Sequence, residues 1–155
     1  MAKEIERKFL TKSSEYRHLA EAVIYRQGYI CNFTDKTVRI RLAGDKAFIT
    51  IKGAATGYSR DEFEYEIPPD DARQMLDKLC EKPLIEKTRR IIALTDKTWV
   101  VDEFEGDNEG LIMAEVELLF AGEPFETPAW IGKEVTGDPR YSNSNLGINP
   151  YKNWR

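Results

Sequence analysis

The sequence predicts a single, mainly β domain of the α+β class, in which antiparallel strands form a barrel or a sandwich and helices pack outside. Its 155 residues suit one domain, 1–155, and are few for two. About eight segments alternate apolar and polar residues, as half-buried strands do, and turn residues separate most of them. Few segments follow a helical pattern, which favours the mainly β class.

The composition excludes several classes of protein. With 41% hydrophobic and 32% charged residues, the chain is globular rather than disordered. A formal net charge of −4 argues against a general nucleic-acid binder, so no nucleic-acid partner is expected. Cys31 and Cys80 have no CxxC spacing, which argues against a zinc site. With no apolar leader and no long apolar run, neither secretion nor a membrane partner is expected, and the predicted compartment is the cytoplasm.

The individual elements follow from periodicity and turn residues. A short helix is expected over 13–21 and a second over 70–81, the latter after two prolines that stop the preceding strand. Strands are expected at 4–10, 24–32, 37–43, 46–53, 58–67, 84–94, 98–105 and 111–119. The remainder, 123–155, mixes Pro, Gly and Asn, with short helical pieces expected around 128–133.

The first strand gathers charge on one face. Successive side chains of a strand point to opposite faces, so Glu4, Glu6 and Lys8 lie together while Ile5 and Phe9 lie on the reverse. Carboxylates roughly 7 Å apart repel by about 2 kcal/mol at an effective dielectric near 20. The repulsion between Glu4 and Glu6 destabilises the strand unless something offsets it, so the charged face requires an explanation.

The same pattern recurs in later strands. One face of each carries, in turn, Arg39 and Arg41; Thr50 and Lys52; Arg60, Glu62, Glu64 and Glu66; Glu115 and Glu117. Two strands leave their orientation open. Strand 84–94 places Lys87 with Arg89 but also carries charges on its other face, and strand 98–105 places Asp102 among apolar residues.

Two interpretations of these faces remain open from the pattern alone. Charged faces of antiparallel strands ordinarily face water. Alternatively, they converge inside a barrel while helices cover the apolar faces. Paired like charges favour the second interpretation, because mixed-sign solvent surfaces avoid them. Separate acidic and cationic strands would suit a divalent metal bound to a polyanion, with carboxylates on Mg²⁺ or Mn²⁺ and Arg or Lys on phosphate oxygens.

These residues resemble the CYTH domain superfamily, the triphosphate tunnel metalloenzymes. Its N-terminal ExExK strand stands here as Glu4-Ile5-Glu6-Arg7-Lys8. The match continues through Gln27-Gly28-Tyr29, Arg39-Ile40-Arg41, Thr50-Ile51-Lys52, Glu62 and Glu64, Glu86-Lys87-Thr88-Arg89, Val101-Asp102-Glu103-Phe104, Glu115-Val116-Glu117 and Arg140-Tyr141-Ser142-Asn143. The ordered series is more specific than ExExK alone.

The resemblance implies an eight-stranded, closed antiparallel β-barrel, or tunnel, with helices outside and a C-terminal helical plug. It also implies a small-molecule triphosphate as substrate and a divalent cofactor, Mg²⁺ or Mn²⁺. We expect hydrolysis of inorganic triphosphate to pyrophosphate and phosphate by a metal-activated water. Phosphoryl transfer requires mainly positioning and charge neutralisation, and the one histidine, His18, has no partners for a nucleophilic triad.

The site residues implied by the resemblance fall into three groups. The metal ligands would be Glu4, Glu6, Glu115 and Glu117, with Asp102 nearby and Glu62 and Glu64 as secondary ligands. The phosphate-binding residues would be Lys8, Arg39, Arg41, Lys52, Arg60, Lys87 and Arg89, with Lys133 reaching in from the C-terminal segment. Catalysis would depend most on Glu4, Glu6, Lys8, Lys87 and Asp102.

Other functions on the same fold remain open. Thiamine triphosphate hydrolysis would need an aromatic platform at a tunnel mouth, for which Tyr29, Tyr58, Trp130 and Tyr141 are available. Cyclisation of ATP, as in class IV-type adenylate cyclases, is a further alternative. A non-catalytic polyphosphate or nucleotide binder would keep the cations without needing organised carboxylates. A closed barrel leaves few strand edges, so a homodimer would use the outer helices or the mouth.

Overall fold

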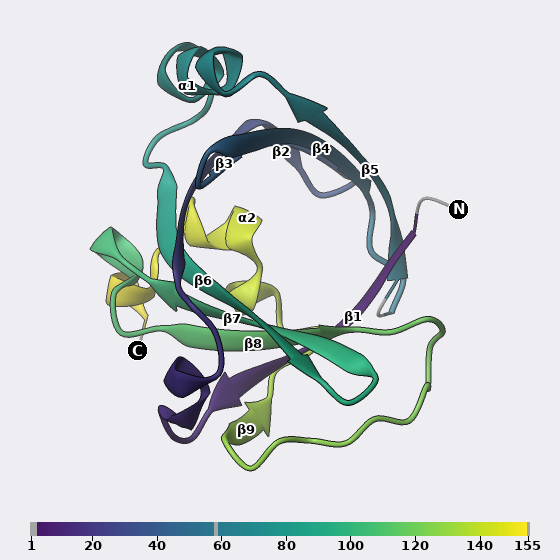
Figure 1. The fold of residues 1–155 in the computed structure, drawn as a ribbon. Helices are drawn as coiled ribbons and strands as arrows, with labels where there is room; N and C mark the ends of the chain where they lie inside the picture. The colour runs from purple at the N-terminus through teal and green to yellow at the C-terminus, as the bar shows by residue number, and fades with distance from the viewer. Residues whose placement is uncertain (1–2, 58, 155) are drawn as a thin grey trace.

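Eight antiparallel strands form a closed ring in the computed structural model, which describes residues 3–57 and 59–154 (Figure 1). The ring order is β5-β4-β3-β2-β6-β7-β8-β1, and β1 also pairs with β5. The strands are β1 (Lys3–Thr11), β2 (Val23–Phe33), β3 (Lys36–Ala43), β4 (Lys46–Gly53), β5 (Ser59–Ile67), β6 (Ile85–Leu94), β7 (Lys97–Phe104) and β8 (Ile112–Glu117). The ring confirms the predicted tunnel and excludes the sandwich. Tyr58, at the expected start of the fifth strand, lies outside the described residues.

The first strand closes the ring by pairing on two sides at different heights. Its residues 3–5 lie opposite β5, with Glu4 paired to Arg60. Its residues 6–10 lie opposite β8, with Lys8 paired to Glu115. The charged face of β1 therefore meets the charged faces of both neighbours, so the ExExK residues stand at the seam of the tunnel.

The helices are few and short. They comprise the 3₁₀ turns η1 (Glu15–His18), η2 (Gly106–Asn108), η3 (Pro139–Tyr141) and η4 (Tyr151–Asn153), and the α-helices α1 (Pro69–Lys78) and α2 (Asn143–Leu146). The helix expected over 13–21 is only the η1 turn, because Ser14 makes no side-chain cap and the chain returns to a strand at Val23. Helix 70–81 is confirmed as α1 and ends three residues early.

The helical pieces expected around 128–133 are wrong, since a ninth strand, β9 (Ile131–Glu134), lies there. It extends the sheet beyond β1 by pairing with Phe9 and Thr11. Gly132 permits this approach, because a Cβ on it would lie 3.2 Å from the carbonyl oxygen of Leu10. Ile131 packs in an apolar cluster, so tertiary contacts outweigh the local helical pattern.

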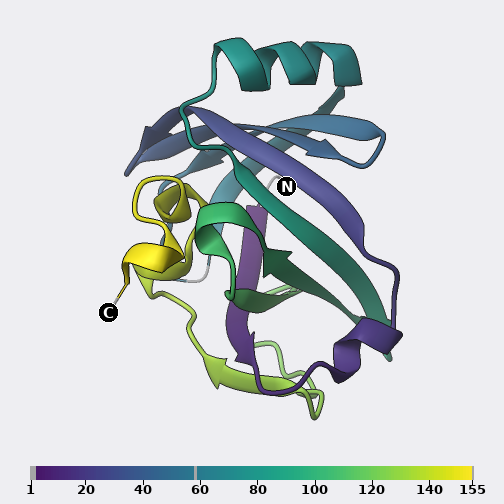
Figure 2. The same ribbon diagram turned by 90° about the vertical axis from the view of Figure 1, so that its left-hand side faces the viewer.

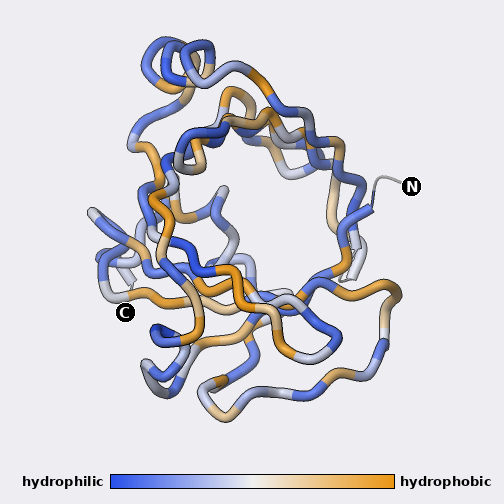
Figure 3. The backbone as a smooth tube through the Cα atoms, in the orientation of Figure 1, coloured by the Kyte–Doolittle hydropathy of each residue, from blue (hydrophilic) through white to orange (hydrophobic). Residues whose placement is uncertain are grey.

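Apolar clusters cover the outside of the ring on two sides. One is centred on Trp99, Trp130 and Tyr16, against the outer faces of β6, β7, β8 and β1. The other packs α1 through Leu76 against Ile40 and its neighbours on β3 and β4. Figure 2 shows α1 and β9 on opposite sides of the ring. Hydrophilic and hydrophobic residues intermingle along the strands in Figure 3, as polar inner and apolar outer faces require.

A third apolar cluster closes one end of the interior. Phe104 and Met113 point inward from β7 and β8 and pack with Tyr141 and Leu146 of the C-terminal segment. Figure 1 shows α2 inside the outline of the ring, which confirms the predicted C-terminal plug. The cluster also explains why charged and apolar residues share one face of β7. That face points into the ring, and it carries the charged Asp102 at one depth and the apolar Phe104 nearer the plugged end. No helix within the described residues has the length and apolarity to cross a bilayer.

Gly28 on β2 gives a direct test of the packing between the ring and the segment that follows α1. A Cβ at this position would lie 2.7 Å from Leu84 Cδ2 and 2.9 Å from Cys80 Cβ. We expect Gly28→Ala to lower the free energy of unfolding by about 1–3 kcal/mol through overpacking. Gly53→Ala is the matched control, since its nearest contact would be an ordinary 3.7 Å. Equal urea-unfolding midpoints for the two variants would contradict this packing.

Candidate active site

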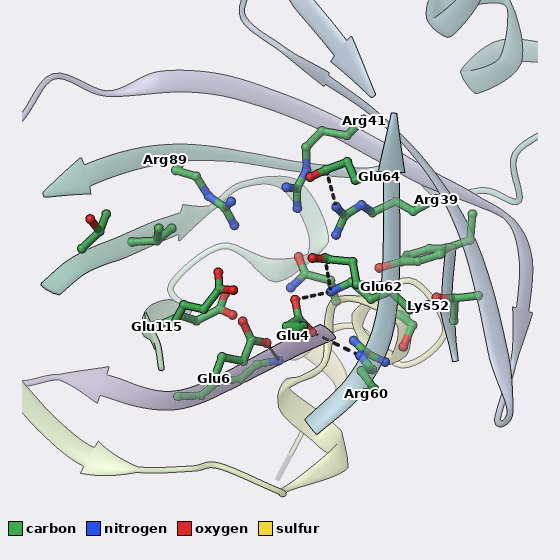
Figure 4. Close-up of a pocket in the computed structure, with 18 residues that line it drawn as sticks. Glu4, Glu6, Arg39, Arg41, Lys52, Arg60, Glu62, Glu64, Arg89 and Glu115 are labelled. Atoms are coloured by element: carbon green, nitrogen blue, oxygen red, sulfur yellow. Dashed lines mark hydrogen bonds and ion pairs between the residues drawn. The ribbon is translucent and has the colours of Figure 1, made fainter. Parts of the chain in front are cut away.

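The ring encloses a polar cavity of about 240 Å³. Every strand of the ring supplies at least one lining residue with an acidic, basic or hydroxyl-bearing side chain. The charged lining residues are Glu4, Glu6, Lys8, Arg39, Arg41, Lys52, Arg60, Glu62, Glu64, Arg89, Glu115 and Glu117. Figure 4 shows the guanidinium groups of Arg39, Arg41 and Arg89 on one side, facing the carboxyl groups of Glu6 and Glu115 on the other.

On the guanidinium side of the cavity, burial and mutual repulsion destabilise the charged form of an arginine. Burial, together with Arg39 and Arg89, lowers the pKa of Arg41 to about 9. Arg41 Nε donates to Gln27 Oε1 at 2.8 Å, which fixes one edge of its guanidinium. Arg39 is only 7% exposed and its Nε has no hydrogen-bond partner. Such a cluster gains free energy from an anion in the cavity, because the anion's charge relieves the repulsion among the guanidinium groups.

Glu4 is already paired by two cations. Its Oε2 accepts from Lys52 Nζ at 2.7 Å and its Oε1 accepts from Arg60 Nε at 3.2 Å. Burial alone would raise the pKa of the Glu4 carboxyl, but Lys52 and Arg60 outweigh it and lower the pKa. Lys52 also lies 3.6 Å from Glu62, so one ammonium joins carboxylates from β1 and β5.

Glu6 and Glu115 form the acidic side of the cavity and lie close enough to share a proton. Burial and the charge on Glu115 raise the pKa of Glu6 well above its usual value. Burial also acts on Glu115, yet Lys8 and the Glu6 hydrogen bond lower its pKa to about 2. In the opposite sense, burial would depress the pKa of Lys8, but Glu115 and Glu6 raise it. The Glu6–Glu115 pair therefore repels a second negative charge and would be relieved by a cation.

The remaining lining carboxylates are more open to solvent. Burial and the charge on Glu4 raise the pKa values of both Glu62 and Glu117. Glu64 accepts from the Thr50 hydroxyl at 3.0 Å and lies 3.7 Å from Arg39. Among the described residues, no three carboxyl, imidazole or thiol side chains converge as a ready ligand set. The donor chemistry nevertheless fits Mg²⁺ or Mn²⁺, because Glu6 and Glu115, with Glu117 paired opposite Glu6, supply the hard carboxyl oxygens that these ions prefer.

Lys87 and Asp102 lie behind the cavity wall rather than on it. The two are almost fully buried, and Lys87 Nζ lies 2.8 Å from Asp102 Oδ2. Arg89 donates to both oxygens of Asp102, at 2.7 and 2.8 Å. Burial would raise the pKa of Asp102, but Arg89 and Lys87 hold it well below its usual range. With both oxygens occupied, Asp102 orients Arg89 in this structure, and Lys87 is not among the lining residues.

Asp102→Asn tests this buried charge cluster. The change leaves Lys87 and Arg89 without their counter-charge, so we expect the free energy of unfolding to fall by about 3–5 kcal/mol. The pKa of Asp102 is lower in the folded than in the unfolded state. The stability that its carboxylate contributes is therefore present above pH 3.8, the usual pKa of an aspartate, and is lost only as the pH falls below that value. Asp61→Asn, which removes an exposed pair with Lys3, is the control. Equal unfolding midpoints for both variants at neutral pH would contradict the assignment.

The C-terminal segment reaches the cavity through residues that the sequence did not single out. Asn143 and Ser144 of α2 line it, and Asn143 Oδ1 accepts from Lys87 Nζ at 2.9 Å and from Gln27 Nε2 at 3.2 Å. Both amides lie within motifs of the family series, but only the closed fold shows their contact. Lys133, by contrast, is exposed on β9 and is absent from the lining residues.

A wider second cavity of about 510 Å³ continues from the first, and Glu4, Glu6 and Lys8 line both. It opens between the segment after β4 and the segment before α2. Of the candidate aromatic residues that the structure describes, Tyr29, Trp130 and Tyr141, none lines this second cavity. Trp130 and Tyr141 are buried in apolar clusters, whereas Tyr29 lines the inner cavity.

Comparison with known proteins assigns the family. The CYTH domain model matches residues 2–145. The chain belongs to the CYTH domain family. Among curated relatives, the inorganic triphosphatase of Acetivibrio thermocellus is 55% identical over 155 residues, covering 100% of this chain and 99% of the relative. The inorganic triphosphatase of Nitrosomonas europaea is 39% identical over 149 residues, covering 94% and 97%.

Solved structures of CYTH-like fold agree with the ring. The crystal structure of an inorganic triphosphatase superposes with a TM-score of 0.65 at 35% identity, covering 96% of both chains. A Pyrococcus horikoshii protein superposes with a TM-score of 0.60 at 24% identity, covering 93% of this chain and 95% of the other. The second likeness is one of fold alone. The CYTH ring is thus shared over nearly the whole length of this chain.

Proposed function

We propose that this chain hydrolyses inorganic triphosphate to pyrophosphate and phosphate in a reaction that depends on a divalent metal ion. The observation that carries the proposal is an enclosed cavity with guanidinium groups on one side and crowded carboxyl groups on the other. The two curated relatives, both inorganic triphosphatases, support the substrate class. The cavity has room for a short phosphate chain, and its charged walls discourage an apolar ligand.

The cations bind and orient the phosphate chain. Arg39, Arg41 and Arg89 line the cavity and offer planar donor groups that suit phosphate oxygens. Lys8 lies 3.9 Å from Glu6 and Arg60 lies 3.2 Å from Glu4, so both can contact the other end of the phosphate chain. Fixed positive charges of this kind stabilise the charge on the transferred phosphoryl group and on the departing pyrophosphate.

The carboxylates hold the divalent ion and position the nucleophile. We assign Mg²⁺ or Mn²⁺ to Glu6, Glu115 and Glu117, with Glu62 and Glu64 as supporting groups and Glu4 holding Lys52 and Arg60 in place. When bound, the ion supplies charge neutralisation and Lewis acidity at the phosphate oxygens. The protein's own carboxylates orient the attacking water opposite the P–O bond that breaks, and they accept its proton as pyrophosphate departs.

Phosphate release from a panel of substrates tests the proposal. Inorganic triphosphate, longer polyphosphate, thiamine triphosphate and ATP should be compared with Mg²⁺, with Mn²⁺ and with excess chelator. We expect triphosphate to be hydrolysed fastest and chelator to abolish the reaction. Full activity in chelator would overturn the metal requirement. Cyclic AMP formed from ATP would favour a cyclase, and tight polyphosphate binding without turnover under either metal would favour a non-catalytic binder.

A further inference from the structure

Two guanidinium groups on the cationic side of the cavity need something to hold them apart. Arg41 comes from β3 and Arg89 from β6, the two strands that flank β2. Both are cations in a largely buried site, so they repel each other. A group packed between them can offset this repulsion and keep both donors in place for a phosphate chain.

Tyr25 on β2 lies between these two arginines. It pairs with Ala43 on β3 and with Lys87 on β6, so Arg41 and Arg89 are its diagonal neighbours on the two sides. The guanidinium carbon of Arg41 lies 5.1 Å from the centre of the Tyr25 ring, and that of Arg89 lies 4.8 Å from it. These distances are in the range of cation–π contacts, in which the negative face of the ring attracts the cation.

The surroundings of Tyr25 separate this role from ordinary core packing. Tyr25 is 9% exposed, yet it belongs to none of the three apolar clusters of the described residues. It is also absent from the residues that line the cavity. The ring of Tyr25 is therefore buried against the charged side chains of Arg41 and Arg89. A residue that only fills space in the core would instead contact apolar side chains.

A chain of buried polar contacts holds the same two arginines from their other sides. Arg41 donates to Gln27, Gln27 donates to Asn143, and Lys87 donates to the same Asn143 oxygen. Lys87 then pairs with Asp102, which accepts both hydrogen bonds of Arg89. The two guanidinium groups are therefore connected twice, once through the Tyr25 ring and once through this series of hydrogen bonds and ion pairs.

We propose that Tyr25 is a positioning residue that fixes the separation of Arg41 and Arg89 and aims both guanidinium groups at neighbouring phosphates of the substrate. The proposal rests on the proposed triphosphatase function and deepens it. Tyr25 makes no contact with the substrate itself, and its effect passes through the two arginines.

Substitutions that keep or remove the ring test the proposal. With inorganic triphosphate and Mg²⁺, we expect Tyr25→Phe to retain the kcat/KM of the wild type, since the ring remains. Tyr25→Leu keeps apolar bulk without a π face, and we expect kcat/KM to fall about tenfold. The penalty should shrink in Arg41→Met and Arg89→Met backgrounds, because a residue that acts through these arginines loses its effect when either is gone. An undiminished penalty in both backgrounds would overturn the role.

Fluorinated phenylalanines at position 25 keep the test independent of how the leucine variant folds. Fluorine weakens the negative face of the ring while preserving its shape, so kcat/KM should fall steadily from phenylalanine to pentafluorophenylalanine, at unchanged melting temperature. An active wild type with a flat fluorination series would overturn the role of Tyr25 and leave the proposed function standing. A wild type without triphosphate turnover would instead overturn the proposed function, and the role of Tyr25 with it.

Discussion

Glu6→Gln is expected to lower the metal-dependent hydrolysis of triphosphate by about 100-fold or more while the fold survives. The substitution removes one of the three carboxylates that we assign to the divalent ion, and electrostatic groups in such sites contribute on this scale. Glu66→Gln is the matched control, because Glu66 lies on the same face of β5 as Glu62 and Glu64 but is exposed and does not line the cavity. Phosphate-release kinetics over a range of Mn²⁺ concentrations measure the effect.

The same variant has a second expected effect, on stability. The pKa of Glu6 is raised in the metal-free fold, so ionising it costs stability as the pH rises from the usual value of 4.5 toward the raised one. Glu6→Gln lacks this cost, and in chelator at neutral pH its melting temperature should equal or exceed that of the wild type. Added Mn²⁺ should stabilise the wild type more than the variant. A variant that melts well below the wild type in chelator would contradict the account of the carboxyl pair.

Arg39→Met is expected to reduce kcat/KM for triphosphate by about 100-fold with little loss of stability. Arg39 lines the cavity and lies 3.7 Å from Glu64, so its removal deletes a phosphate donor without breaking a close ion pair. The nearest acid, Glu64, is 40% exposed at its side chain and can be solvated when the arginine is gone.

Arg90 provides the control for this prediction, because its Nε is also buried without a partner. Its guanidinium, however, pairs with Glu103 at 3.0 Å and lies over the Tyr16 ring, away from the cavity. Arg90→Met should therefore affect thermal unfolding and leave kcat/KM unchanged. If Arg39→Met retained more than half of the wild-type kcat/KM, the phosphate-binding role of Arg39 would be wrong.

Much of the fold could be predicted because strand parity is a local property. The alternation in β1, β3, β4, β5 and β8 places its charged side chains on the inner face without knowledge of any partner strand. The family series then added what parity cannot supply, namely that the faces close into a ring. Glu66 shows the limit of parity, since it shares the face of Glu62 and Glu64 but lies beyond the cavity.

The burial of Lys87 and Asp102 behind the cavity wall could not be predicted, because it depends on depth along the tunnel rather than on which face a residue occupies. Both point inward, yet the C-terminal plug covers them and Asn143 takes a hydrogen bond that an exposed Lys87 could have given to a phosphate. The helix predicted at 128–133 was wrong for a related reason, because a strand forms there instead. Its pairing partner, β1, lies more than a hundred residues earlier, so no local pattern reveals it.

A crystal structure of the protein with Mn²⁺ and a non-hydrolysable imido analogue of triphosphate is the most direct test of the central claim. Anomalous scattering locates the metal independently of the phosphates. We expect Mn²⁺ against the carboxylates of Glu6 and Glu115, and phosphate oxygens within hydrogen-bond distance of Arg39, Arg41 and Arg89. An analogue bound on the outer surface, or metal held away from both carboxylates, would contradict it.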